Sequence, residues 1–562
     1  MRPQPHVMAL AALLVVACAA PQPGSQAPRS APSEEPPART LVVATDANVD
    51  GFGEMFAGGK SGPEELQAMV HRVLAEADAQ GTYVPGIATK LPSLDDGTWK
   101  LRSDGGSETI WSLQPNARWH DGTPLTADDI VFSWQVAIAP DVPYKSRQAV
   151  NRIEDVETVD AHTVSIRWKS VFVGAGRLTE RDLFVLPKHI LDPLFTGDRN
   201  AFVNATYWSS AFVGLGPFRI VDWVPGSQVQ LQAFDGFFSG RPPISSILFK
   251  TVPDVNTAVA NIRAGDIDVW LGSSFGLEHA RTLKDDWEST GAGRVMTYPR
   301  LIFEIRLRPE DAKVSDVRMR KALYQTIDRE SIVRDLYFGL LQVANSYIAP
   351  GTTGFERIEA GLVKYPFDPT GAQALLADLG WRKGADGLLR NDRGERFALP
   401  FSTTSGNRER EELQAVIADM WKAAGFDVAF ENVPLSVQSD PTYVFSTTDL
   451  SGISTDFEAN IPRIDGRNRR TPQNPRGANV WGYANDDVDQ LLDEWGRTLE
   501  RERQIEIEAA VMRHVSEDLP ILPINYRIEA ITVANGVSGV PPRSSVQSAT
   551  NTWNVETWQR TR

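Results

Sequence analysis

Apolar and polar residues alternate in short stretches of the first half of the chain, a pattern typical of half-buried strands. The apolar positions are Val164, Ile166 and Trp168 in HTVSIRWKS, and Val229, Leu231 and Ala233 in SQVQLQAF. Residues 41–45 read LVVAT, a continuous run of strand length, which predicts a strand covered on both faces.

Further along, the apolar residues recur every three or four positions, which predicts helices. The helical sets are Met319, Ala322, Leu323, Thr326 and Ile327; Leu375, Leu376 and Leu379 before Gly380; Leu413, Val416, Ile417, Met420, Trp421 and Ala424 before Gly425; and Val488, Leu491, Leu492 and Trp495. Thr126, with Asp129 three residues later, is typical of a helix start. Strand-rich sequence before about residue 299 and helix-rich sequence from about 316 to 520 indicate α/β or α+β lobes.

The first eighteen residues predict export and lipidation. An apolar run from Met8 to Ala17 follows Arg2 and is too short to span a bilayer as a helix. It ends in VVAC, which resembles the bacterial lipoprotein box, so we expect cleavage before Cys18 and a lipid on its sulfur. An ordinary secretory signal with an incidental cysteine is the alternative.

Residues 18–39 contain six prolines and almost no apolar side chains, which predicts a disordered tether, and we expect folded structure from Thr40. No later stretch reaches 18 consecutive apolar residues. We therefore expect a soluble body outside the cytoplasm, held at a membrane by its lipid and lying in the periplasm if the cell has an outer membrane.

Composition limits the possible functions. The chain has 562 residues, enough for several lobes, and its net charge of -15 argues against a general nucleic-acid binder. The single cysteine excludes an internal disulfide framework and a cysteine-rich metal site. Seven histidines without close spacing do not predict a metal site, so we expect neither metal nor cofactor.

Two short motifs suggest chemistry only weakly. GSSFG, from Gly272 to Gly276, fits a serine-hydrolase elbow with Ser274 as nucleophile, but no local sequence marks its histidine or acid. A plain loop between a strand and a helix is the favoured explanation, because five-residue patterns recur by chance in long chains. AGGKS, residues 57–61, lacks the first glycine of a phosphate-binding loop because Glu54 stands there.

Six blocks in a fixed order carry a family resemblance. WSLQPNARWHDGTPLTADDIVFSW, residues 111–134, resembles the peptide/nickel class of extracellular solute-binding proteins of ABC importers. The other blocks are GLGPFRIVDWVPGSQVQL, PPISSILFKTVPDVNTAVANIRAGDIDV, DVRMRKALYQTIDRESIV, YPFDPTGAQALLADLGW and NVWGYANDDVDQLLDEW. The resemblance covers nearly all of residues 40–562.

The resemblance implies a two-lobed α/β fold of the periplasmic-binding-protein type, with a two-strand hinge and a subdomain inserted in the first lobe. It places lobe I near 40–88, 209–299 and 524–562, the insert near 89–208, and lobe II near 300–523, after a signal peptide at 1–17. The hinge strands are expected in TYPRLIFEIRL and PILPINYR.

The implied function is capture, without catalysis, of a short peptide between closing lobes and its delivery to ABC permease subunits driven by a separate ATPase. We expect a monomer. A metal chelate or a glycoside is the alternative ligand, and a secreted serine hydrolase using Ser274 is the alternative function.

The resemblance also suggests ligand contacts. Peptide-binding relatives carry W-x-x-D, whose acid pairs with the ligand's amino group; here Asp456 stands at the acidic position between Thr455 and Phe457, without the tryptophan and without the following Asp-Pro. Trp481 and Tyr483 fall in a block that approaches the cleft in the family, with core packing as their alternative role. Asp46 and Asn48 follow the first strand, where α/β sheets place binding loops, or they form a simple turn.

Overall fold

The computed structural model describes residues 40–53, 55–56, 62–144, 147–273, 275–438, 440, 443–543 and 549–561. The predicted signal peptide, the tether with Cys18, and Ser274 lie outside the described residues. From Thr40 onward the chain forms one compact unit.

A ten-stranded sheet organises this unit. From one edge to the other its strands are β16 (Asp427–Phe430), β15 (Ala398–Ser402), β17 (Thr448–Ser454), β12 (Gly293–Leu307), β18 (Ile521–Ala534), β11 (Val269–Trp270), β1 (Leu41–Thr45), β10 (Ser246–Thr251), β9 (Gln228–Ala233) and β8 (Phe218–Val224). β1 pairs in parallel with both β10 and β11, and its Leu41, Val43 and Ala44 side chains are fully buried, as its unbroken apolar run predicts.

Helices divide the sheet into two lobes, which we define by their elements. Lobe I comprises β1 and β8–β11 with α1 (Glu64–Val70), α5 (Val255–Ala264) and α6 (Leu277–Thr290). Lobe II comprises β15–β17 with α7 (Val317–Gln325), α9 (Phe355–Gly361), α10 (Pro369–Asp378), α11 (Arg408–Ala424), α13 (Phe457–Ile464), α14 (Asp486–Trp495) and α15 (Arg501–Asp518). Separate buried apolar clusters lie in the two lobes.

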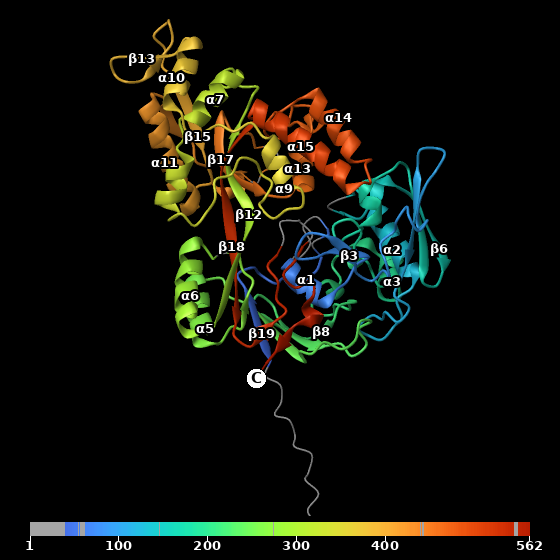
Figure 1. Ribbon diagram of the computed structural model, residues 1–562. Helices are drawn as coiled ribbons and strands as arrows, with labels where there is room; N and C mark the ends of the chain where they lie inside the picture. Colours follow the sequence, from blue (N-terminus) through green and yellow to red (C-terminus); the bar gives the residue numbers. More distant parts are fainter. Residues whose placement is uncertain are drawn as a thin grey trace, which may run out of the picture. The chain divides into compact units, whose positions relative to one another are not determined.

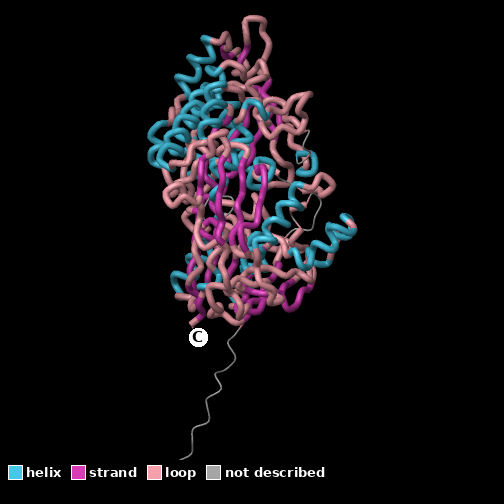
Figure 2. The backbone as a smooth tube through the Cα atoms, turned by 90° about the vertical axis from the view of Figure 1, so that its right-hand side faces the viewer, coloured by secondary structure: helices cyan, strands magenta, loops and turns pink. Residues whose placement is uncertain are grey.

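The strands β12 and β18 run through both lobes (Figure 1). They pair antiparallel from Gly293 opposite Ala534 to Arg306 opposite Ile521. The register is irregular at Arg300 and again between Phe303 and Glu304. One end of β12 carries the lobe II strand β17, whereas β18 carries the lobe I strand β11 at its other end. Figure 2 shows these long strands lying side by side.

A separate four-stranded sheet forms the insert, which lies beside lobe I in the order β4 (Trp99–Leu101), β5 (Ser107–Ser112), β7 (Thr163–Trp168) and β6 (Ile153–Asp160). Its helices are α2 (Ala127–Ile138) and α3 (Lys188–Gly197), and the short buried helix η2 (Val173–Gly176) lies between β7 and α3 in the chain. The start of α2 is the predicted one, because the Thr126 N–H donates to the Asp129 carboxylate over 2.9 Å.

The remaining strands and α-helices are short. They are β2 (Ala75–Ala77) with β3 (Tyr83–Pro85), β13 (Arg382–Lys383) with β14 (Leu389–Arg390), β19 (Val537–Ser538) with β20 (Gln559–Arg560), and the helices α4 (Arg199–Val203), α8 (Arg329–Ser331) and α12 (Leu435–Gln438). The predicted helices are found as α7, α10, α11 and α14, and α11 stops at Gly425, whose φ of +107° suits glycine.

Candidate functional site

A cavity of about 430 Å³ lies where lobe I, the insert and the start of α13 in lobe II meet. Its volume falls within the range of about 300–1,000 Å³ common for small-molecule sites. Aromatic side chains of Tyr83, Tyr144, Phe172 and Phe184 supply apolar surface. In the part of the chain that the structure describes, the charged side chains of the lining are five acids and two bases, namely Glu64, Glu180, Asp182, Asp456, Glu458, Arg177 and Arg181.

Asp456, the acidic residue singled out in the sequence, lines this cavity. It stands where β17 ends and α13 begins, and its Oδ1 accepts the N–H of Ala459 over 3.2 Å as the N-cap of α13. The Ser454 hydroxyl in turn accepts the Asp456 N–H over 3.2 Å. The cap therefore fixes the carboxylate at the cavity wall.

The neighbours of Asp456 point away from the cavity. Thr455 is fully buried, and its hydroxyl donates over 3.2 Å to the carbonyl of Arg300, at the irregularity of β12. Phe457 is also buried, with its ring 5.6 Å from that of Trp495. Both residues hold the Asp456 backbone in place, and the ligand contacts predicted for them stay predictions.

Trp481 and Tyr483 lie in the core of lobe II and do not line the cavity. Trp481 has no exposed surface, and Tyr483 donates its hydroxyl to Asp518 over 2.8 Å. Both rings therefore pack in the core of lobe II, which is the alternative role given for them in the sequence analysis.

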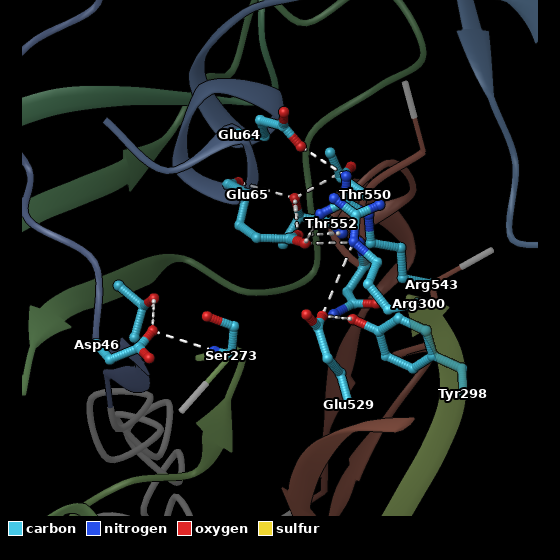
Figure 3. A network of polar contacts seen from close by, with 12 residues as sticks. Asp46, Glu64, Glu65, Ser273, Tyr298, Arg300, Glu529, Arg543, Thr550 and Thr552 are labelled. Carbon is cyan, nitrogen blue, oxygen red and sulfur yellow. Dashed lines mark hydrogen bonds and ion pairs between the residues drawn. The ribbon is translucent and has the colours of Figure 1, made fainter. Parts of the chain in front are cut away.

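Asp46 and Asn48 also lie outside the cavity lining. Asp46 accepts the Ser273 N–H over 3.1 Å, which joins the end of β1 to the segment after β11. Figure 3 shows this pair apart from the charged group around Glu64. Asn48 is exposed. Neither residue has a contact here that identifies a ligand site.

The Arg177 side chain joins the insert to lobe II at the cavity edge. Its guanidinium donates to Glu458 over 2.8 Å and lies 4.6 Å from the ring centroid of Tyr83 and 6.0 Å from that of Trp495. Nearby, the Val173 N–H donates to the Gly496 carbonyl over 3.1 Å. Partial desolvation raises the pKa of Glu458, whose side chain remains partly exposed, and Arg177 opposes that rise.

A charged network lies behind the cavity wall at Glu64 (Figure 3). Arg543, whose side chain is 9% exposed, donates to Glu64 over 2.6 Å and lies 3.8 Å from Glu65. Arg181 also pairs with Glu64. Although burial alone would raise it, the pKa of Glu64 is lowered by these two arginines and by Arg300.

Glu180 differs from the other acids of the lining. No other described residue donates a hydrogen bond to its carboxylate, and the nearest cationic atom is the Arg181 Nε at 3.7 Å. Its side chain is 18% exposed. Burial, the largest influence, raises the pKa of Glu180 to about 8, and Arg181 only partly opposes this.

Sequence reasoning missed Glu180, Arg177 and Glu458. A signal was present in VFVGAGRLTERDLFVL, where a charged run separates two apolar segments that are both buried in the structure. Among the described residues, no group of three or more histidine, cysteine or acidic side chains is arranged to hold a metal ion. None of the described helices is both long and apolar enough to cross a membrane.

Comparisons with known proteins match this arrangement. The oligopeptide-binding protein AppA of Bacillus subtilis is 22% identical over 559 residues, covering 98% of this chain and 97% of AppA. Its structure with a nonapeptide superimposes with a TM-score of 0.70 over 93% of this chain and 99% of that one. NikZ of Campylobacter jejuni, solved with Ni(L-His), gives 0.71 at 20% identity, covering 93% of this chain and 99% of NikZ.

These likenesses define the class of the fold as a two-lobed binding protein, which confirms the predicted α/β architecture. The sequence model of the bacterial extracellular solute-binding proteins, family 5, middle region, matches residues 82–469. The chain belongs to this family of extracellular solute-binding proteins, and the resemblance identified from its sequence is confirmed.

Family membership places the chain outside the cytoplasm, among solute-binding proteins. It gives no support to the serine-hydrolase alternative, whose nucleophile Ser274 lies outside the described residues.

Proposed function

We propose that this protein is the receptor of an ABC importer and captures a short peptide in the cavity beside Asp456, then delivers it unchanged to the permease. The observation that carries the proposal is the position of the Asp456 carboxylate, at the wall of a cavity bounded by both lobes. A peptide's α-amino group is a cation at neutral pH and pairs well with a partly buried carboxylate.

The charge of the lining supports this ligand class over the metal-chelate alternative. Among the described residues of the lining, five acids face two arginines, and this excess of acids favours a cationic guest over an anionic chelate. A glycoside carries no charge that would use this imbalance. The aromatic side chains offer surface to varied peptide side chains.

Closure about β12 and β18 is the proposed mechanism of capture. These are the strands that pass between the lobes, and the irregularity at Arg300 lies where β12 leaves lobe I for lobe II. The lobe and insert boundaries predicted above are proposed as the moving parts. Contacts made only in the closed state would select that state when a ligand is bound.

Lipidation at Cys18 is proposed to hold the receptor at the membrane through the proline-rich tether, with the mature protein a monomer. The VVAC sequence and the location of the family outside the cytoplasm support this. The proposed partners are the permease subunits and a separate ATPase.

Isothermal titration calorimetry with trialanine tests the role of Asp456. We expect Asp456→Asn to weaken binding about tenfold to a hundredfold, because a charged hydrogen bond to a ligand contributes roughly 1.5–3 kcal/mol. Asparagine also caps helices well, so the substitution should preserve α13. Asp46→Asn, outside the cavity, is the matched control.

N-acetyl-trialanine provides the complementary ligand, since it lacks the cationic amine. It should bind the wild-type protein about as weakly as trialanine binds the Asp456→Asn variant. Equal affinity of trialanine for the wild type and for the variant would remove Asp456 from the site.

A further inference from the structure

Glu180 lies in the cavity without the protein partners that the other acids of the lining have. Glu64 pairs with Arg181 and Arg543, and Glu458 pairs with Arg177. Asp182 accepts from both the N–H and the hydroxyl of Thr179, each over 3.0 Å. Asp456 caps α13.

Among the described residues, Glu180 forms an ion pair with Arg181 alone, whose closest atom is 3.7 Å away and whose guanidinium already pairs with Glu64. A mostly buried carboxylate that accepts no hydrogen bond from another described residue can accept one from a ligand. A ligand cation placed beside it would supply hydrogen-bond donors that the other described residues do not.

The shape of the lining suits a long cationic side chain. Glu180 belongs to the segment that follows η2, whereas Asp456 comes from lobe II, so the two carboxylates line one cavity from different parts of the molecule. The aromatic residues Tyr83, Tyr144, Phe172 and Phe184 also line it. Lysine and arginine bury their aliphatic stems on such apolar surface while the charged head meets an acid.

We propose that Glu180 is a specificity-determining residue that pairs with a lysine or arginine side chain of the bound peptide, so that the receptor prefers basic peptides. The inference rests on the proposed peptide-binding function and adds the chemical class of ligand. Asp456 takes the α-amino group and Glu180 takes the second positive charge. Attraction at two separate carboxylates distinguishes a peptide with two cationic groups from one of similar size that carries only the α-amino group.

Calorimetry with three tripeptides tests the proposal: Ala-Lys-Ala, Ala-Gln-Ala, and Ala-Lys-Ala acetylated on the lysine side chain. The three share the α-amino group and differ in the second charge. We expect the wild-type protein to bind the lysyl peptide about tenfold more tightly than either neutral peptide, and Glu180→Gln to remove the difference. Glu502→Gln, on an exposed face of α15, should retain the preference.

The acetylated peptide keeps the test decisive even where Glu180→Gln fails to fold, because it removes the charge from the ligand instead of the protein. Equal affinities of the three peptides for the wild type would overturn the role of Glu180 and leave the proposed function intact. A lysine preference that survives Glu180→Gln would assign the recognition to another carboxylate and also overturn it. Binding of none of the three peptides would contradict the proposed function itself.

Discussion

Glu180 is the residue of the cavity whose protonation should respond most to a bound ligand. Burial raises its pKa to about 8, against 4.5 for an ordinary glutamate, so it is mainly protonated at pH 7 in the empty protein. Arg181 lowers the pKa, whereas Glu64 and Asp182 raise it. On its other side, His71 and Glu76 line a small hollow that Glu180 shares.

Because Glu180 must be ionised to pair with a ligand cation, the preference for a lysyl peptide should grow as pH rises. We expect the ratio of affinities for Ala-Lys-Ala and Ala-Gln-Ala to increase from pH 6 to pH 8, by up to about tenfold per unit. The ratio cancels titration of the α-amino group, which both peptides carry. Calorimetry at pH 6, 7 and 8 measures it. A ratio that is flat in the wild type and in Glu180→Gln alike would contradict this coupling.

Among the elements, η2 and the Arg177 that follows it contact lobe II at the start of α13 and at the end of α14. Arg177 and Glu458 are the charged pair of this contact, and their guanidinium–carboxylate bond can exist only while the two parts touch. We expect Arg177→Gln and Glu458→Gln each to weaken peptide binding by favouring separation of the parts.

A double-mutant cycle on trialanine affinity isolates the pair itself. The expected coupling is about 0.5–1 kcal/mol, modest because the Glu458 side chain is 42% exposed. Strictly additive effects of the two substitutions would show that the pair does not contribute to ligand capture.

At the scale of single elements, the sequence predicted the strands and helices whose apolar residues follow a regular spacing. The alternation in β7 and β9 and the spacing in α11 follow directly from which side chains are buried on one face. The cavity has no such periodic signature, because its lining joins segments as distant as Glu64, Glu180 and Asp456. Asp456 was identified through a family motif, whereas Glu180 stands in a charged run that resembles any solvated loop.

At the scale of the whole molecule, the long strands β12 and β18 connect the contacts around Asp456 with the proposed closure of the lobes. The Thr455 hydroxyl donates to the carbonyl of Arg300 on β12, and Asp456 next to it lines the cavity, so a hydrogen bond connects the proposed hinge to the proposed ligand site. A ligand that bridges Asp456 and the insert should therefore change the angle between the lobes.

The most direct test of this account measures the distance between the insert and lobe II in solution. Spin labels attached through Glu157→Cys on β6 and Glu502→Cys on α15, in a protein carrying Cys18→Ser, report it by double electron–electron resonance. Adding trialanine should shift a broad or long distance distribution to a single shorter one. An unchanged distribution at a peptide concentration that calorimetry shows to be saturating would contradict capture by lobe closure.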